Sequence, residues 1–145
     1  MFQHILFPTD GEAPSRTALA QCVAFAKDCG ARLTAVHVVA PFHVLSTSAE
    51  MLRDTPETYA AHSQARARVC LEQVAEAARA QGVVYETLVM EHDDPHEAII
   101  EAAHSRHCDL IAMASHGRRG MRGMLMGSET QKVLTHSKLP VLVYR

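Results

Sequence analysis

Glycine is concentrated in one segment of the chain, residues 115–128. Four of the seven glycines lie there: Gly117, Gly120, Gly123 and Gly127. Because glycine has no side chain, its backbone N–H can approach a phosphate closely. A helix is expected to begin at the end of this segment, and a helix start adds unpaired N–H donors and the positive end of a dipole. The segment therefore predicts an anion-binding loop, and a surface turn without a ligand is the alternative.

Charged side chains accompany this segment and a second polar turn. Arg118, Arg119 and Arg122 could neutralise a phosphate or form a solvated surface without one. The second turn, Pro8-Thr9-Asp10-Gly11, follows the first apolar run of the chain. Asp10 could bind a ligand there or only support the start of the next helix. A site built from both turns is expected, with these structural alternatives open.

Histidine chemistry is indicated only weakly, although the chain has ten histidines. His92 and His96 are four residues apart, but Pro95 starts a helix between them and a shared metal-binding face is not expected. His116 lies in the glycine-rich segment, and no carboxylate in the sequence must orient it. We interpret His116 as a loop histidine and expect neither a metal site nor a catalytic histidine.

Phosphoryl transfer is also indicated weakly. The chain contains no G-x-x-x-x-G-K-[S/T] motif, and its three lysines are Lys27, Lys132 and Lys138. None of them lies in the glycine-rich segment, so no lysine is placed there to contact a β- or γ-phosphate. Any ATP turnover is expected to be slow.

The elements that position these turns alternate regularly along the chain. Apolar runs predict five strands, at residues 5–7, 33–39, 83–90, 110–114 and 140–144. Helical spacing predicts four helices between them, which end before Gly30, near Ala80, near residues 104–108 and near His136. This alternation predicts an α/β fold with one doubly wound, five-stranded parallel sheet and helices on both faces. Ligands bind such sheets at the carboxyl ends of the strands, where both polar turns lie.

Two helix starts carry capping signals. Asp94 is expected to cap a helix, with Pro95 at its first position and Glu97 reaching back as in a capping box. Ser128 and Gln131 have the same spacing, so Ser128 is expected at an N-cap. Residues 40–56 contain prolines and small polar residues, and they are expected to form a loop.

Composition limits the compartments and partners. The chain has 145 residues and a formal net charge of −2, so no strong field attracts nucleic acid or an anionic membrane. The sequence has neither the basic n-region of a signal peptide nor an apolar run long enough for a membrane span. Four scattered cysteines without a C-x-x-C pair fit buried thiols in a reducing compartment. We expect a cytosolic protein with neither a nucleic-acid nor a membrane partner.

The spacing of the glycine-rich segment resembles the nucleotide motif of the universal stress proteins, G-x-x-G, nine residues, G-[S/T]. In this chain the motif is Ala114-x-x-Gly117, nine residues, Gly127-Ser128. The resemblance covers essentially the whole chain, including residues 5–11, the Asp94-Pro95 helix start and the final residues 140–143. One departure is Ala114 in place of the first glycine of the motif. Its methyl group matters only if the backbone needs a positive φ or touches the ligand.

The resemblance implies strand order 3-2-1-4-5, frequent dimerisation through the last strand and, in one branch of the family, ATP binding. Asp10 and the Val38 backbone would hold the adenosine end, beside Pro8 and Thr9. The phosphate side of the implied site comprises Ala114, Gly117, Arg118, Gly127, Ser128 and the amides of Glu129 and Thr130. The implied ligand is ATP or a related AMP or ADP, with Mg²⁺ left open.

The function expected from these observations is that of a cytosolic, stress-response regulatory protein that binds an adenine nucleotide with slow or no hydrolysis. A nucleotide-independent interaction module and a weak ATP hydrolase or transferase are the alternatives. A homodimer is expected because the last strand would otherwise leave an apolar edge with unpaired backbone groups.

Overall fold

The fold is given by a computed structural model that describes residues 1–43, 51, 54–116 and 126–145. In these residues, a parallel sheet of five strands has the order β3-β2-β1-β4-β5. The strands are β1 (His4–Pro8), β2 (Arg32–Val39), β3 (Tyr85–Glu91), β4 (Leu110–Ala114) and β5 (Val141–Tyr144). The helices are α1 (Ala13–Cys29), α3 (Pro56–Gln81), α4 (Pro95–Ser105) and α5 (Ser128–His136). The predicted doubly wound sheet and its strand order are confirmed.

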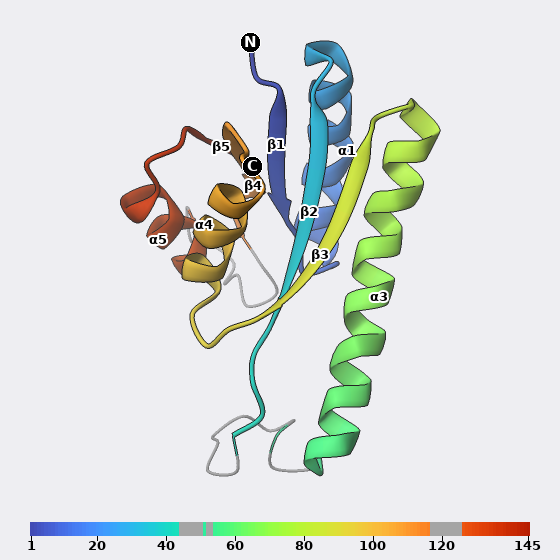
Figure 1. Cartoon of the computed structure of the whole chain (residues 1–145), viewed down its shortest axis with the longest axis vertical. Helices are drawn as coiled ribbons and strands as arrows, with labels where there is room; N and C mark the ends of the chain where they lie inside the picture. Colours follow the sequence, from blue (N-terminus) through green and yellow to red (C-terminus); the bar gives the residue numbers. More distant parts are fainter. Residues whose placement is uncertain (44–50, 52–53, 117–125) are drawn as a thin grey trace.

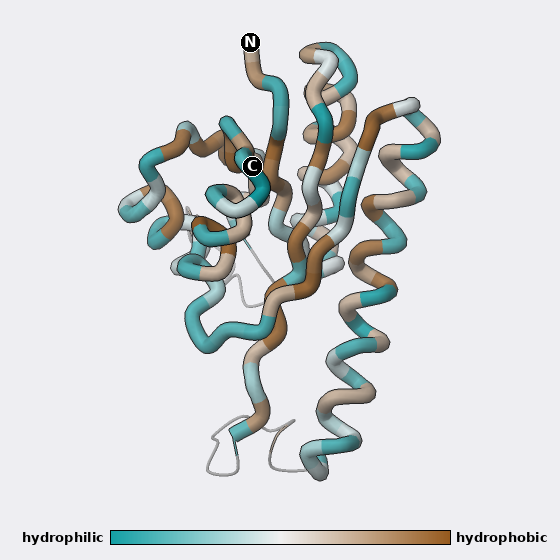
Figure 2. Tube along the Cα trace, viewed as in Figure 1, coloured by the Kyte–Doolittle hydropathy of each residue, from teal (hydrophilic) through white to brown (hydrophobic). Residues whose placement is uncertain are grey.

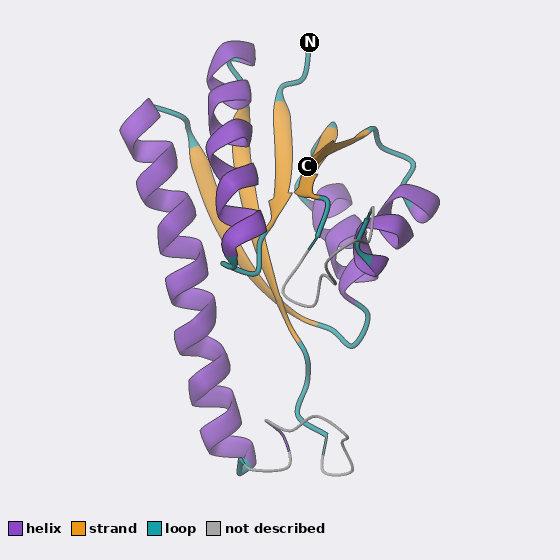
Figure 3. Cartoon of the chain, turned by 180° about the vertical axis from the view of Figure 1, so that it is seen from behind, coloured by secondary structure: helices purple, strands orange, loops and turns teal. Residues whose placement is uncertain are grey.

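The helices cover both faces of the sheet (Figures 1 and 3). α1 and α3 pack on one face, where Phe7 and Val74 belong to one buried cluster. α4 and α5 pack on the other, where Leu6 and Val133 belong to a second cluster. Successive strand residues thus enter different clusters, which explains the nearly continuous apolar runs of the strands (Figure 2).

Local sequence signals explain several helix ends. The Thr55 hydroxyl caps α3 by accepting a hydrogen bond from the Thr58 amide (3.1 Å), and Pro56 is the first helical residue. Gly30 and Gly82 follow α1 and α3 with φ angles of 67° and 70°. This left-handed conformation favours glycine, so the two expected helix ends are confirmed.

The two expected capping boxes are wrong. Gly127 holds the N-cap position of α5, and Ser128 is its first helical residue. Asp94 holds the N-cap position of α4, but its side chain makes no capping hydrogen bond. The Asp94 amide donates instead to His92 Nδ1 (2.9 Å), and the Glu97 carboxylate lies 3.6 Å from His92 Nε2. A histidine from the preceding segment thus accepts the hydrogen bond that the capping box would have supplied.

The remaining expectations concern cysteines and loops. All four cysteines are free thiols, of which Cys22, Cys70 and Cys108 are buried. In the expected loop 40–56, residues 44–50 and 52–53 lie outside the described residues, and Pro56 already begins α3. None of the described helices has both the length and the apolar character needed to cross a membrane.

Candidate functional site

The turn after β1 is attached to β2 at the carboxyl edge of the sheet. The Thr9 amide donates to the Val36 carbonyl oxygen (2.9 Å), and the His37 ring lies 2.9 Å from the Thr9 carbonyl oxygen through Nδ1. The Thr9 hydroxyl accepts from the Gly11 amide (3.1 Å). His37 is buried and packs in this contact as a hydrogen-bonded residue.

The Asp10 carboxylate holds the start of α1. Its Oδ1 accepts hydrogen bonds from the Glu12 amide (3.0 Å) and the Ser15 hydroxyl (2.8 Å). Through these contacts Asp10 supports the start of α1, which is one of the two roles that the sequence left open for it. They also fix the carboxylate between the end of β1 and the start of α1, at the edge where a ligand is expected.

Gly11 lies against α3 in a position that favours glycine. Its φ is 77°, and a Cβ built there would lie 2.5 Å from Cys70 Sγ. Burial, and then the nearby Asp10 carboxylate, raises the pKa of the Cys70 thiol. The thiol is therefore protonated at neutral pH and acts as a packing group. The shape of the turn depends on α3 as well as on β2.

The start of α5 is held against the end of β4. The Gly127 amide donates to the Ser115 carbonyl oxygen (2.6 Å). The Thr130 hydroxyl donates to the Ala114 carbonyl oxygen (3.0 Å), and both residues are buried. These two bonds fix the direction in which the first turn of α5 points.

The first turn of α5 presents unpaired donors. Among the described residues, no acceptor receives a hydrogen bond from the amides of Ser128, Glu129 and Thr130. Three N–H groups at the positive end of a helix dipole can bind an anion. Gly127 has φ −69° and ψ 153°, which any residue adopts. If glycine is needed there, the reason is the space left by its missing side chain.

These elements meet where the sheet changes the direction of its connections. β1 and β4 are neighbours, but the chain leaves β1 for α1 on one face and continues from β4 to α5 on the other. Such a point is the usual ligand site of an open α/β sheet. Pro8 ends β1 and Val38 lies near the end of the adjacent β2. The predicted site residues that the structure describes all lie at this edge, whereas Gly117 and Arg118 lie outside the described residues.

Ala114, the departure from the family motif, has ordinary strand geometry. It lies in β4, pairs with Tyr144 of β5 and does not have a positive φ. The backbone therefore gives no reason for glycine at this position. Of the two conditions under which the methyl group would matter, a positive φ is therefore ruled out.

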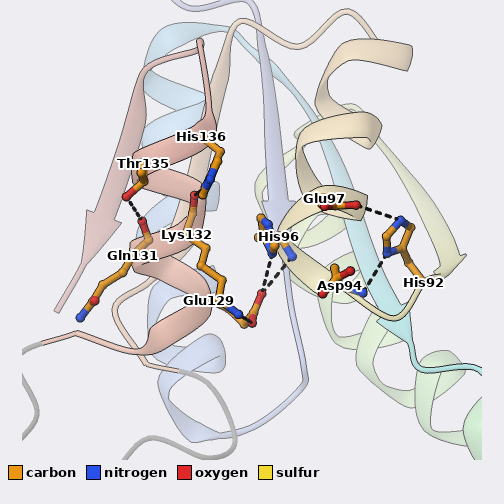
Figure 4. A network of polar contacts seen from close by, with 9 residues as sticks. All are labelled: His92, Asp94, His96, Glu97, Glu129, Gln131, Lys132, Thr135 and His136. Carbon is orange, nitrogen blue, oxygen red and sulfur yellow. Dashed lines mark hydrogen bonds and ion pairs between the residues drawn. The ribbon is translucent and has the colours of Figure 1, made fainter.

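A polar network joins the starts of α4 and α5 (Figure 4). Glu129 Oε2 accepts from the His96 backbone amide (3.0 Å), and Oε1 accepts from Lys132 Nζ (3.1 Å). The sequence pointed only to the Glu129 amide. Its carboxylate adds a negative charge to the same helix turn that carries the unpaired donors.

Among the described residues, one group of side chains has metal-ligating atoms close enough together to share an ion. Single atoms of His92, Asp94 and Glu97 lie within 4.8 Å of one another. However, His92 Nδ1 accepts the Asp94 amide, so the neutral ring carries its proton on Nε2, the atom that faces Glu97. A metal ion at Nε2 would have to displace that proton. Nδ1 also carries no proton while it accepts from the Asp94 amide, so the ring would lack both of its protons. The group is better explained as the hydrogen-bonded start of α4.

A groove of about 770 Å³ lies elsewhere, between α3 and β3. Its walls include Tyr59 and Leu71 of α3 and Tyr85 and Val89 of β3. None of the described site residues lines it. The groove reaches the carboxyl end of β2 at Val39, next to Val38, but no residue of β1, β4 or α5 lines it.

Sequence comparison decides the family. Residues 1–145 match the sequence model of the Universal stress protein family. The chain belongs to the universal stress protein family. A Thermus aquaticus relative, "Universal stress protein in QAH/OAS sulfhydrylase 3'region", is 33% identical over 146 residues, with 100% of both chains covered. The universal stress protein YxiE of Bacillus subtilis is 31% identical over 149 residues, again with 100% of both covered.

Solved structures show the same fold. The hypothetical protein MJ0577 of Methanocaldococcus jannaschii has a TM-score of 0.80 at 26% identity, covering 99% of this chain and 95% of that one. A universal stress protein in complex with cAMP has a TM-score of 0.72 at 23% identity, covering 99% and 97%. The Archaeoglobus fulgidus universal stress protein in complex with dAMP has a TM-score of 0.67 at 16% identity, covering 99% and 98%. The last two likenesses concern the fold alone.

Three contributors to the site were missed by sequence reasoning. Ser15 supports Asp10, Cys70 packs under Gly11, and the Ser115 carbonyl oxygen holds Gly127. Ser15 could have been suspected because it follows Asp10 by five residues across a turn. Cys70 is 59 positions after Gly11, and no local pattern predicts that contact.

Proposed function

We propose that this universal stress protein binds an adenine nucleotide, ATP or a related AMP or ADP, at the edge between β1 and β4. The adenosine end would be held by the residues at the ends of β1 and β2: Pro8, Thr9, Asp10 and the Val38 backbone. The phosphate side would be formed by the segment between β4 and α5: Ala114, Gly117, Arg118, Gly127, Ser128 and the amides of Glu129 and Thr130.

One observation carries the proposal. The first turn of α5 is fixed to the end of β4 by the Gly127 amide and the Thr130 hydroxyl. The backbone amides of Ser128, Glu129 and Thr130 donate to no described acceptor. Fixed donors at a helix start bind phosphate without first having to be ordered. The Asp10 turn lies across the same edge, so one ligand with a polar base end and an anionic tail fits both parts.

The solved relatives support the class of ligand. Two universal stress proteins with this fold have solved structures in complex with cAMP and with dAMP. Both ligands are adenine nucleotides with a phosphate group. The shared fold makes the same chemical class the first choice for this chain.

We further propose a regulatory role in the cytosolic stress response, in which bound ATP is hydrolysed slowly or not at all. Binding of Mg²⁺ together with the phosphates is left open. The chain has no phosphate-loop lysine motif, which supports binding rather than turnover. We also propose a homodimer through β5. Nucleotide-independent interaction is the contrary outcome that the following test would reveal.

Equilibrium dialysis of freshly purified protein against ATP, AMP and GTP, with and without Mg²⁺, tests the ligand class. We expect retention of ATP and AMP and weaker retention of GTP, because the proposed contacts of the base are made by Asp10 and the Val38 backbone. A folded protein that retains no adenine nucleotide would instead be an interaction module.

Asp10→Ala tests the orientation of the ligand. We expect adenosine and ATP to bind about tenfold more weakly by similar factors, because a hydrogen bond to a charged group is lost at the end they share. Asp28→Ala, at the exposed far end of α1, is the control. A loss confined to ATP would move Asp10 to the phosphate side, where a bound metal ion would explain it.

A further inference from the structure

Glu129 is the side chain through which the starts of α4 and α5 meet (Figure 4). Its Oε2 accepts from the His96 backbone amide (3.0 Å) and lies 3.5 Å from Nδ1 of the His96 ring. Both residues are in the first turns of their helices. One carboxylate therefore lies near the positive ends of two helix dipoles.

The His96 ring is confined beside this carboxylate. Its side chain is only 13% exposed, and Nδ1 is buried with no hydrogen-bond partner among the described residues. The ring centroid lies 5.4 Å from that of His136 on α5. Protonation would place an N–H⁺ donor between the ring and Glu129, whereas a neutral ring leaves the carboxylate charge uncompensated from this side.

Among the described residues, the other charged and titratable groups near this pair come from α5, from α4 and from the segment before α4. α5 contributes Lys132 and His136, and the start of α4 contributes four side chains: His92, Asp93, Asp94 and Glu97. The β1 and β2 residues that share the apolar cluster with α4 and α5 are Leu6, Val36 and Val38. Among the described residues, Glu129 is the carboxylate within 4.0 Å of the His96 ring.

We propose that the His96–Glu129 pair is a proton-dependent regulator of phosphate binding at the start of α5. This inference rests on the proposed nucleotide function. With His96 neutral, Glu129 and Lys132, whose Nζ lies 3.1 Å from Oε1, form an ion pair with no net charge. With His96 protonated, the three side chains carry one net positive charge, which attracts a phosphate at the neighbouring amides. Protonation of His96 therefore raises the affinity for ATP and leaves the affinity for adenosine unchanged.

Calorimetric titration of ATP and adenosine at about pH 8 and about pH 6 tests the regulator. Glu129→Gln keeps an acceptor for the His96 amide and removes the charge. At about pH 8 we expect this variant to bind ATP about two- to fivefold more tightly than the wild type, the size typical of one charge at a helix end. Adenosine should bind both proteins equally.

A variant of His96, the residue that accepts the proton, supplies the second comparison. His96→Gln should keep the weaker ATP affinity of the alkaline wild type at both pH values. Because ATP itself gains protons over this range, the difference between variant and wild type is the quantity to compare. His96→Gln should also take up fewer protons than the wild type on binding ATP, measured in buffers of different ionisation enthalpy.

Glu97→Gln is the matched control, because it removes a carboxylate from the start of α4 that faces His92 instead of α5. It should keep the pH response of the wild type, and thermal melts establish that each variant folds. Unchanged ATP affinity in Glu129→Gln would overturn the regulator, and so would identical pH responses in His96→Gln and the wild type. If adenosine still binds in either case, the proposed function stands. A folded wild type that binds neither ligand overturns both.

Discussion

At the residue scale, Gly11 shows how the candidate site depends on distant packing. Its left-handed φ of 77° favours glycine, and its missing side chain leaves room for Cys70 Sγ. The two requirements are separable because Gly82 has a similar φ of 70° with no atom within 4 Å of the position of a Cβ. The conformational cost can thus be measured apart from the steric one.

Gly11→Ala should lower the free energy of unfolding by about 2–5 kcal/mol, of which about 1–2 is the left-handed conformation and about 1–3 is overpacking. Gly82→Ala, the control, should lose only about 1–2 kcal/mol. Urea denaturation measures both. Adding Cys70→Ala to Gly11→Ala should recover part of the loss. Equal losses at Gly11 and Gly82 would mean that the Cys70 contact has no energetic weight.

At the scale of elements, a polar chain that is buried at His4 and Thr34 and half-buried at Glu86 links three strands at the opposite edge of the sheet. His4 Nε2 of β1 lies 2.6 Å from Thr34 Oγ1 of β2, which donates to Glu86 Oε1 of β3 (2.7 Å). Because the Thr34 hydroxyl donates to Glu86, it accepts from His4, and the neutral ring carries its proton on Nε2. The chain helps to hold the strand order that places the site.

The stability of this arrangement should depend on pH through His4. Burial, and then Arg32, lowers the pKa of His4 below 6.5 in the folded protein. The unfolded chain therefore binds this proton more readily, and stability is lost as pH falls through 6.5 towards the folded pKa. His4→Gln keeps an N–H donor but cannot titrate. Urea denaturation at about pH 7.5 and about pH 5.5 should show a smaller loss in His4→Gln than in the wild type.

If the two proteins lose the same stability over this range, His4 is not a source of the pH dependence. Other carboxylates and histidines titrate in both proteins. Their contribution therefore cancels in the comparison.

The elements were largely predictable, because their periodicity is a local property. The apolar runs predicted the strands to within two residues at each end, and Gly30 and Gly82 marked two helix ends. Asp94 holds the expected N-cap position, but the hydrogen bonds of the capping boxes at Asp94 and Ser128 were mispredicted. His92 accepts the Asp94 amide, and Gly127 occupies the N-cap position next to β4.

The candidate site was predictable in part, through the motif spacing. Residues of the two turns could be named because the carboxyl ends of parallel strands share one edge. The contacts of Gly11 with Cys70 and of Glu129 with His96 join segments that lie far apart in the chain. Such contacts depend on how the helices pack, which a local pattern does not specify.

At the scale of the whole molecule, β5 is an edge strand, and no other described strand pairs with its outer side. Pro140 O accepts from the Ile111 amide, and Ile111 pairs with Val141. In this parallel register the amides of Val141 and Val143 point away from β4. The free edge therefore offers donors and acceptors for antiparallel pairing with a second copy.

Sedimentation equilibrium at micromolar concentration should give twice the chain mass of 15.9 kDa. Val141→Pro should shift the protein towards the monomer, because it removes one donor of the free edge while sparing the ladder to β4. Val89→Pro is the matched control on β3, the other edge, where its amide also points outward. A wild-type mass of one chain throughout the concentration range would contradict the dimer.

ATP binding by Gly127→Val, compared with the wild type in one calorimetric titration, tests the nucleotide site most directly. Valine fits the φ of −69° and ψ of 153° at this position, so the fold should persist and its melting curve should show this. The β-branched side chain would occupy the approach to the amides of α5, and we expect ATP affinity to fall at least about tenfold. An unchanged ATP affinity in the folded variant would contradict a phosphate site at the start of α5.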